Sequence, residues 1–349
     1  MPSPRSPHAI PPQLTAAADT RRVMAPEAMA GSARRRALLT FGAALAVPGC
    51  ALRLSPSPSP ATAPTLDGAP PVALPGTRQI ELQAGSHLHR IMLAVPPAAP
   101  PAGGWPVLYV LDGDLLFAPT AQLMRNRFAR GPNVPAEGAL VVGLGYAADP
   151  AGDRVLDLDA RSLDYTPPIP GMSPGPTHDT RGRREGGADA FLDFVDTVVR
   201  PLVERSAPVD RARQTLLGHS YGGLCVLHAL FTRPGGFQNY VAASPSVWWR
   251  DGAILQTQAR FVAGRRGDAA PLRLLITEGE REALPPADPA RAALVRERRG
   301  GERLHALLAG LRGVPGLDLR HVRIPGADHG ASMLPAAQLA LELALQGRA

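Results

Sequence analysis

The pattern of apolar and polar positions changes near residue 78, where strand-like and helix-like segments begin to alternate. Most strand-like runs are continuously apolar and end in a turn, which is typical of strands buried on both faces of a sheet. The first two runs alternate instead and are joined by Gly85-Ser86, which predicts an antiparallel hairpin. The predicted strands cover residues 78–85, 89–96, 105–113, 138–146, 214–220, 240–249, 272–279 and 318–326.

Helical periodicity appears between these strands. Residues 188–206 carry apolar side chains at helical spacing, and Pro201 is expected to kink this helix or to begin a new turn. The other predicted helices cover residues 223–231, 289–312 and 334–346. Buried strands that alternate with helices form a mostly parallel sheet with helices on both faces, so the predicted class is α/β. Ligands are expected at the carboxyl ends of such strands.

The residues before the first strand have the order of an export signal. Residues 32–50 read SARRRALLTFGAALAVPGC, with three arginines, a short apolar run and small residues at the end. Arg35-Arg36 and the residues after them resemble a twin-arginine motif, and VPGC resembles a lipobox with Cys50 as the acylated residue. We therefore expect an exported, periplasmic protein; cleavage of the signal without lipidation is the alternative.

Composition supports a three-part chain and excludes several functions. We expect a leader over residues 1–50, a Pro/Ser-rich tether over 51–77 and a catalytic domain over 78–349.

Of the net charge of +7, the leader carries +4, and no basic tract is interleaved with aromatic residues, so nucleic-acid binding is not expected. Two cysteines and the absence of metal-ligand spacing predict no metal and no cofactor. The only membrane contact expected is the lipid anchor.

The segment Gly218-His219-Ser220-Tyr221-Gly222 is a G-x-S-x-G motif between a predicted strand and a predicted helix. In an α/β-hydrolase fold this motif presents a nucleophilic serine on a tight turn that glycines make possible. Ser220 is therefore the predicted nucleophile. An ordinary serine between two glycines is the alternative.

A nucleophilic serine needs a base, which is selected from nine histidines by position. His329 follows the last predicted strand in the loop GADHGA, where this fold places its base, whereas His321 lies inside that strand. His219 adjoins Ser220, but its side chain is expected to point away. His329 is therefore the predicted base.

The orienting acid is expected after the preceding strand, in LLITEGEREAL. Glu282 stands three residues after Gly279 and is the predicted acid; Glu278 and Glu280 are the alternatives. The predicted oxyanion donors are the backbone N–H groups of Tyr221 and of Asp114 in LDGD. The alternative for Asp114 is that its side chain caps the following helix.

These motifs, in this order, resemble the esterase-D-like superfamily of α/β-hydrolases: LYVLDGD, GHSYGGL, ASPSVWW, GERE and DHG. RSLDYTP (161–167) and SPSVWW (244–249) resemble its siderophore-esterase branch, which cuts the trilactone of enterobactin-like catecholate siderophores. The resemblance implies a carboxylic ester hydrolase that acts on a small-molecule ester, including an iron-loaded siderophore. In that branch the acid is a Glu in some members and dispensable in others.

A bulky, anionic substrate would need cationic and aromatic contacts. The candidate cations are Arg125, Arg127 and Arg130, for which a solvated helix face is the alternative. The candidate aromatic contacts are Trp248 and Trp249, for which a core role of one of them is the alternative. Arg161 and Asp164 are expected to pair and to order a loop beside the cleft.

Two other functions compete with siderophore hydrolysis. One is an esterase of the same fold that acts on feruloyl or short acyl esters. The other is an exported lipoprotein that binds a ligand without catalysis. The complete set of Ser220, Glu282 and His329 in the expected order argues against the second.

Overall fold

The computed structural model describes residues 66–130, 137–147, 155–169, 177–285 and 288–347. The chain divides into two compact units, Met1–Ala69 and Pro70–Ala349, and every element described below belongs to the second. The leader and Cys50 lie outside the described residues. None of the helices in the described ranges has the length and hydropathy of a membrane span.

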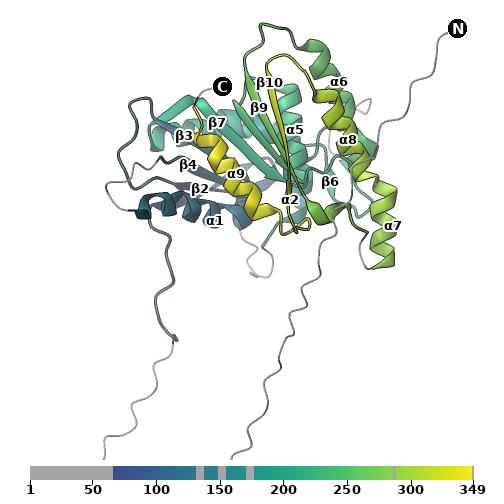
Figure 1. Ribbon diagram of the computed structural model, residues 1–349. Coiled ribbons are helices and arrows are strands. Elements are labelled where there is room, and N and C mark those ends of the chain that lie inside the picture. The colour runs from purple at the N-terminus through teal and green to yellow at the C-terminus, as the bar shows by residue number, and fades with distance from the viewer. Residues whose placement is uncertain (1–65, 131–136, 148–154, 170–176, 286–287, 348–349) are drawn as a thin grey trace, which may run out of the picture. The chain divides into compact units, whose positions relative to one another are not determined.

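Within the described residues, eight strands form one sheet, in the order β1-β2-β4-β3-β7-β8-β9-β10 (Figure 1). β1 and β2 form an antiparallel hairpin and β2 is antiparallel to β4, whereas the other neighbours are parallel. The strands are β1 (Thr77–Ala84), β2 (His87–Ala94), β3 (Trp105–Leu111), β4 (Leu140–Tyr146), β7 (Val209–His219), β8 (Asn239–Ala243), β9 (Leu272–Gly279) and β10 (Leu317–Ile324). The predicted α/β class and N-terminal hairpin are confirmed.

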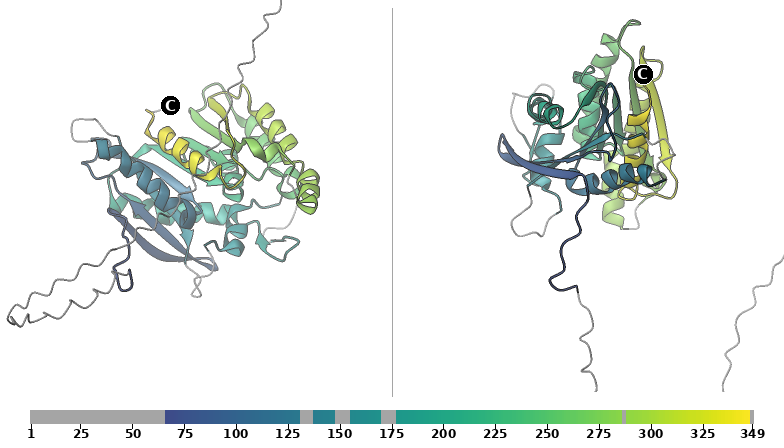
Figure 2. Two further views of the ribbon diagram at one scale, coloured as in Figure 1. Left: turned by 60° about the horizontal axis from the view of Figure 1, so that its bottom comes forward. Right: turned by 90° about the vertical axis from the view of Figure 1, so that its left-hand side faces the viewer.

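Helices cover both faces of this sheet, as the apolar strands require. The larger core packs β-sheet side chains against one set of helices, and the smaller core packs the opposite face against another. The right-hand view of Figure 2 shows the yellow α9 on the opposite side of the sheet from the green helices. The smaller core contains α1 (Gly113–Asn126) and α9 (Met333–Leu345); the larger contains α2 (Leu158–Tyr165), α3 (Ala188–Phe194), α4 (Arg200–Ser206), α5 (Tyr221–Thr232), α6 (Ile254–Gly264) and α8 (Gly300–Leu311).

The strand order reverses at β3, which fixes where the site lies. The chain passes from β3 to β4 on one side, and β7 lies against β3 on the other. A crevice forms at the carboxyl ends of strands where the order reverses in this way. The turn after β3 and the turn after β7 therefore lie next to each other.

The predicted helix over residues 188–206 is continuous but irregular. A π-helical segment (Val195–Val199) separates α3 from α4, and Pro201 lies in the first turn of α4. Proline lacks an N–H and clashes with the preceding turn, and a π-helical bulge is one way in which a helix accommodates such a break.

The predicted single helix over residues 289–312 is wrong. Two helices, α7 (Pro289–Arg298) and α8, are separated by Arg299, whose φ is 50°. The apolar spacing is interrupted here, since no apolar side chain occurs between Val295 and Leu304, and the left-handed residue before Gly300-Gly301 turns the chain. The sequence also missed α2, α6 and the small hairpin of β5 (Thr177–His178) and β6 (Arg184–Glu185).

Candidate active site

Ser220 lies on a sharp turn between β7 and α5. Its φ of 59° and ψ of −114° are outside the regions that residues with a side chain usually adopt. A Cβ on Gly218 would stand 2.3 Å from the carbonyl oxygen of Gly222, so glycine is required at 218 for the turn to close. Gly222 itself has room for a Cβ, with its nearest neighbour 3.5 Å away. Strain at a single serine after a strand is typical of a nucleophile turn.

His329 and Glu282 are in direct contact. Nδ1 of the imidazole lies 2.9 Å from Oε2 of the carboxylate, which the neighbouring strands β9 and β10 bring together. Burial alone would raise the pKa of Glu282, but hydrogen bonds from His329, Ser244 and the backbone of Gly279 hold it below its ordinary value. An ionised carboxylate can only accept, so Nδ1 carries the proton and Nε2 keeps the lone pair that a base needs.

The hydroxyl of Ser220 has a neighbour that the sequence analysis missed. Its Oγ lies 3.3 Å from Oγ of Ser246, and the N–H of Ser246 donates to the carbonyl oxygen of Ser220 at 3.0 Å. The structure thus joins Glu282 to His329 directly and places the serine hydroxyl against a second hydroxyl. Nothing in the segment SPSVWW distinguishes Ser246 from an ordinary turn residue.

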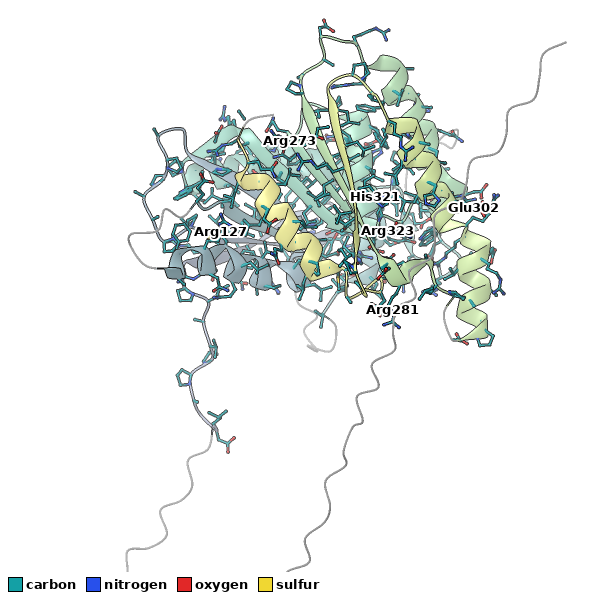
Figure 3. The ribbon with its side chains drawn as sticks, in the orientation of Figure 1. Arg127, Arg273, Arg281, Glu302, His321 and Arg323 are labelled. Carbon is teal, nitrogen blue, oxygen red and sulfur yellow. The ribbon has the colours of Figure 1, made fainter. Side chains whose placement is uncertain are left out.

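The other acidic candidates face elsewhere. Oε1 of Glu278 lies 3.2 Å from Nε2 of His321 and 3.0 Å from Nε of Arg323, both on β10 (Figure 3). Oε2 of Glu280 accepts the backbone N–H of Gly326 at 2.8 Å. In the described structure, Glu282 is the one of the three that contacts His329. His321 is already paired within the sheet.

The two predicted oxyanion donors lie at helix starts. Tyr221 begins α5, and Asp114 is the second residue of α1, so both N–H groups belong to first turns, whose donors have no partner within the helix. The side chain of Asp114 accepts from the N–H of Tyr146 at 2.8 Å and from Arg90 at 3.2 Å. It thereby ties α1 to β4 and β2. Burial raises the pKa of Asp114, and the Tyr146 N–H and Arg90 oppose this rise. The N–H of Gly113, the first residue of α1, is a second candidate donor.

Arg161 pairs with Asp112, and the predicted Arg161–Asp164 pair is wrong. Nε and one terminal nitrogen of Arg161 each lie 2.9 Å from a different carboxylate oxygen of Asp112. The segment is the helix α2, which directs Arg161 to the end of β3. Asp164 instead accepts from Tyr146 Oη at 3.1 Å, and burial raises the pKa of Asp164 to about 7. The Arg161–Asp112 pair supports the turn that precedes α1.

Four side chains form a stacked row beside Ser220: Arg161, Tyr221, Trp248 and Arg298. The guanidinium of Arg161 lies 5.7 Å from the centre of the Tyr221 ring, and the Tyr221 and Trp248 rings are 5.9 Å apart. The guanidinium of Arg298 lies 3.7 Å from the centre of the Trp248 ring. This stacked row places two cations and two aromatic faces next to the turn that carries Ser220.

The two predicted tryptophans differ in position. Trp248 belongs to the stacked row, whereas Trp249 is buried, with Nε1 donating to Oε1 of Glu185 at 2.7 Å. Glu185 also accepts from Arg250 and so joins the small hairpin to the segment after β8. Trp249 therefore packs in the core.

The predicted arginines of α1 lie away from Ser220. Arg125 is in the last turn of α1 and Arg127 follows that turn, about 18 Å of helix from the turn after β3. Figure 3 shows Arg127 by this end of α1, where its Nε donates to the carbonyl of Glu137. The side chain of Arg130 lies outside the described part of the chain.

The chain belongs to the esterase family: the family model described as "Putative esterase" matches residues 87–309. Together with the fold, this membership defines the protein as a carboxylic ester hydrolase. The matched residues include Ser220 and Glu282 and end before His329.

The chain is similar in sequence to two siderophore esterases and in structure to a third siderophore hydrolase. The chain is 34% identical over 213 residues to the ferri-bacillibactin esterase of Bacillus subtilis, covering 60% of this chain and 72% of that protein. It is 40% identical over 187 residues to the siderophore triacetylfusarinine C esterase of Aspergillus fumigatus, covering 53% and 59%. The structure of the siderophore hydrolase EstB of Aspergillus nidulans superposes with a TM-score of 0.69 at 29% identity, over 79% of this chain and 97% of that one. These similarities lie in the siderophore-esterase branch.

Proposed function

We propose that this protein is an exported serine esterase that hydrolyses the ester bonds of a catecholate siderophore trilactone. The observation that carries the catalytic part is the 2.9 Å contact between His329 and Glu282 beside the strained turn of Ser220. The names of the relatives support the substrate, since they act on siderophores. An iron-loaded substrate belongs to this proposal.

In the proposed reaction, Ser220 Oγ attacks the ester carbonyl carbon while Nε2 of His329 takes its proton. Glu282 holds the tautomer of His329 and stabilises the imidazolium. The N–H groups of Tyr221 and of the Gly113-Asp114 turn donate to the oxyanion. His329 then protonates the departing alkoxide. Water next attacks the acyl-enzyme while Nε2 of His329 takes its proton, and His329 returns this proton to Ser220 Oγ as the bond to the acyl group breaks. No metal or cofactor is required for these steps.

The stacked row supports an anionic aromatic substrate. A catechol ring can stack on an exposed part of Trp248 or Tyr221, and its negative charge is attracted by Arg298, whereas the charge of Arg161 is already balanced by Asp112. Burial lowers the pKa of Arg298, so a nearby anion would compensate for part of the cost of its desolvation. Feruloyl and short acyl esters lack this negative charge, so a substitution of Arg298 should affect their hydrolysis less than that of a catecholate.

We predict that Arg298→Gln lowers kcat/KM for a trilactone catecholate by about tenfold, the equivalent of about 1.4 kcal/mol, and leaves p-nitrophenyl acetate nearly unchanged. The wild-type value for the catecholate should also fall as salt rises, because charge attraction is screened. Arg127→Gln is the matched control and should change neither substrate. If Arg127→Gln has the larger effect, the anion is bound near the far end of α1, as the sequence analysis predicted.

The proposed export rests on the sequence alone. Arg35→Lys with Arg36→Lys should retain the precursor in the cytoplasm, and Cys50→Ser should release a soluble mature form. Mass spectrometry of the N-terminus shows whether the signal has been cleaved and whether Cys50 is acylated. A mature N-terminus other than an acylated Cys50 would rule out the lipid anchor, and full export of the double lysine variant would rule out the twin-arginine route.

A further inference from the structure

A second set of hydrogen bonds lies behind the contact between His329 and Glu282. Oε1 of Glu282, the oxygen that does not face His329, accepts from Ser244 Oγ at 2.6 Å and from the N–H of Gly279 at 2.7 Å. The carbonyl oxygen of His329 lies 2.8 Å from Nε2 of His219 and accepts from Ser332 Oγ, also at 2.8 Å. Oγ of Ser244 and Oγ of Ser332 are 3.0 Å apart. The five side chains form a closed network.

The two serine hydroxyl protons of this network cannot satisfy all of its acceptors without a further donor, which is His219. Ser244 has one proton, and the carboxylate of Glu282 at 2.6 Å is its strongest acceptor. Ser332 also has one proton, which it can give either to Ser244 or to the carbonyl of His329. When Ser332 donates to Ser244, only His219 remains to satisfy that carbonyl. A carbonyl cannot donate, so Nε2 of His219 carries a proton.

Burial fixes the hydrogen bonds of these side chains and the charge state of His219. His219, Ser244 and Ser332 are all buried, and a buried polar group that loses its partner costs free energy. Burial lowers the pKa of His219 to about 4, so its ring is neutral at neutral pH. A neutral ring matters because the His219 and His329 rings are only 4.5 Å apart, and a second cation would oppose formation of the imidazolium.

The backbone of Ser244 is strained where it enters the network. Its φ is 42°, in the left-handed region, and its N–H donates to Thr277 on β9 at 2.7 Å. Such strain persists in a residue with a side chain only where the surroundings determine the conformation. Here it directs the Ser244 hydroxyl at Glu282.

We propose that His219, Ser244 and Ser332 are positioning residues that hold the loop of His329 and the carboxylate of Glu282 in register with Ser220. The inference rests on the proposed serine-esterase mechanism. His329 is on a loop and its side chain is 45% exposed, so the ring has little packing of its own. Its alignment depends on the carbonyl behind it and on the acid beside it. A displacement of about 1 Å in a catalytic group can cost about 100-fold in rate.

The test uses the full chain and two substrates, p-nitrophenyl acetate and a trilactone catecholate. His219→Leu removes the donor and should lower kcat about 10- to 100-fold on both, with little change in KM. His219→Gln keeps an N–H near the position of Nε2 and should recover most of kcat. Ser332→Ala should have a smaller effect alone and a larger one with His219→Leu, since both serve the same carbonyl.

His228→Leu is the matched control. His228 is also buried, lies on α5 and contacts Asp189 rather than His329, so its loss should lower stability without lowering kcat. Unchanged kcat in His219→Leu would overturn the proposal, and so would equal losses of kcat in His219→Leu and His228→Leu or failure of His219→Gln to recover activity. Failure of the mechanism itself has a different signature: a fluorophosphonate would not label Ser220 in the wild-type protein, which would overturn both proposals.

Discussion

Ser220→Ala is expected to lower kcat/KM for every ester substrate by roughly 10⁵-fold, because the reaction then has no nucleophile and retains only binding and oxyanion contacts. His329→Ala should cause a similar loss. The groups act as a unit, so the double variant should be scarcely slower than either single variant. Steady-state kinetics with p-nitrophenyl acetate and a trilactone catecholate measure the loss.

The folded state should survive both substitutions. The hydroxyl of Ser220 makes a long contact with Ser246, and the ring of His329 is half exposed, so neither packs the core. Far-UV circular dichroism and urea unfolding are the controls. Substantial hydrolysis by purified Ser220→Ala would exclude Ser220 as the nucleophile. A large loss in Glu280→Ala with little in Glu282→Ala would reassign the acid.

Asp112→Ala is expected to lower the free energy of unfolding by about 3–5 kcal/mol, because it leaves the guanidinium of Arg161 without its bidentate partner in a nearly buried place. Asp112 is buried and Arg161 is 13% exposed, so water can do little to replace the lost contact. Asp112 also has a φ of 52°, and its N–H donates to Tyr165 Oη at 3.0 Å. Urea unfolding at neutral pH gives the value.

The chain offers a matched pair on the surface. Arg211 and Glu204 are also joined by two hydrogen bonds, at 2.8 and 2.7 Å, but the Arg211 side chain is 78% exposed. Glu204→Ala should change stability little, since water replaces an exposed contact. The double variant Asp112→Ala, Arg161→Met should recover much of the loss. Equal effects of Asp112→Ala and Glu204→Ala would mean that the buried pair contributes no more than a surface one.

The sequence predicted the sheet well because buried strands leave a strong signal. Continuous apolar runs such as those of β3 and β4 cannot be amphipathic helices on the surface, and they are confirmed as central strands. The helix break at Arg299 was missed for a different reason, because the predicted helix was extended across a polar stretch. A positive φ at an arginine has no signature in the sequence, but the Gly-Gly pair after Arg299 and the gap in apolar positions between Val295 and Leu304 are signals of a turn.

The residues of the candidate site also differ in how clearly the sequence marks them. Ser220 and His329 follow strands within short motifs, so local sequence was enough to nominate them. Ser246, Ser332 and the His219 contact depend on three turns meeting across the sheet, which apolar periodicity does not describe. Arg298 was also missed. It lies about 50 positions after Trp248 in the chain, and its long side chain brings the guanidinium to 3.7 Å from the centre of the Trp248 ring. Apolar periodicity carries no signal for such a contact.

The break between α7 and α8 follows the residue proposed to bind the substrate's charge, and α7 carries none of the groups proposed to react. Arg298 ends α7 just before the break, whereas every group proposed to react lies on a turn at the end of β3, β7, β9 or β10. α7 can therefore change its length, tilt or charge without disturbing the geometry of the sheet edge. A lineage that meets a new siderophore could adapt by mutating a single peripheral helix. Under the proposed role of Arg298, exchange of α7 between relatives should transfer selectivity and leave the reacting groups unchanged.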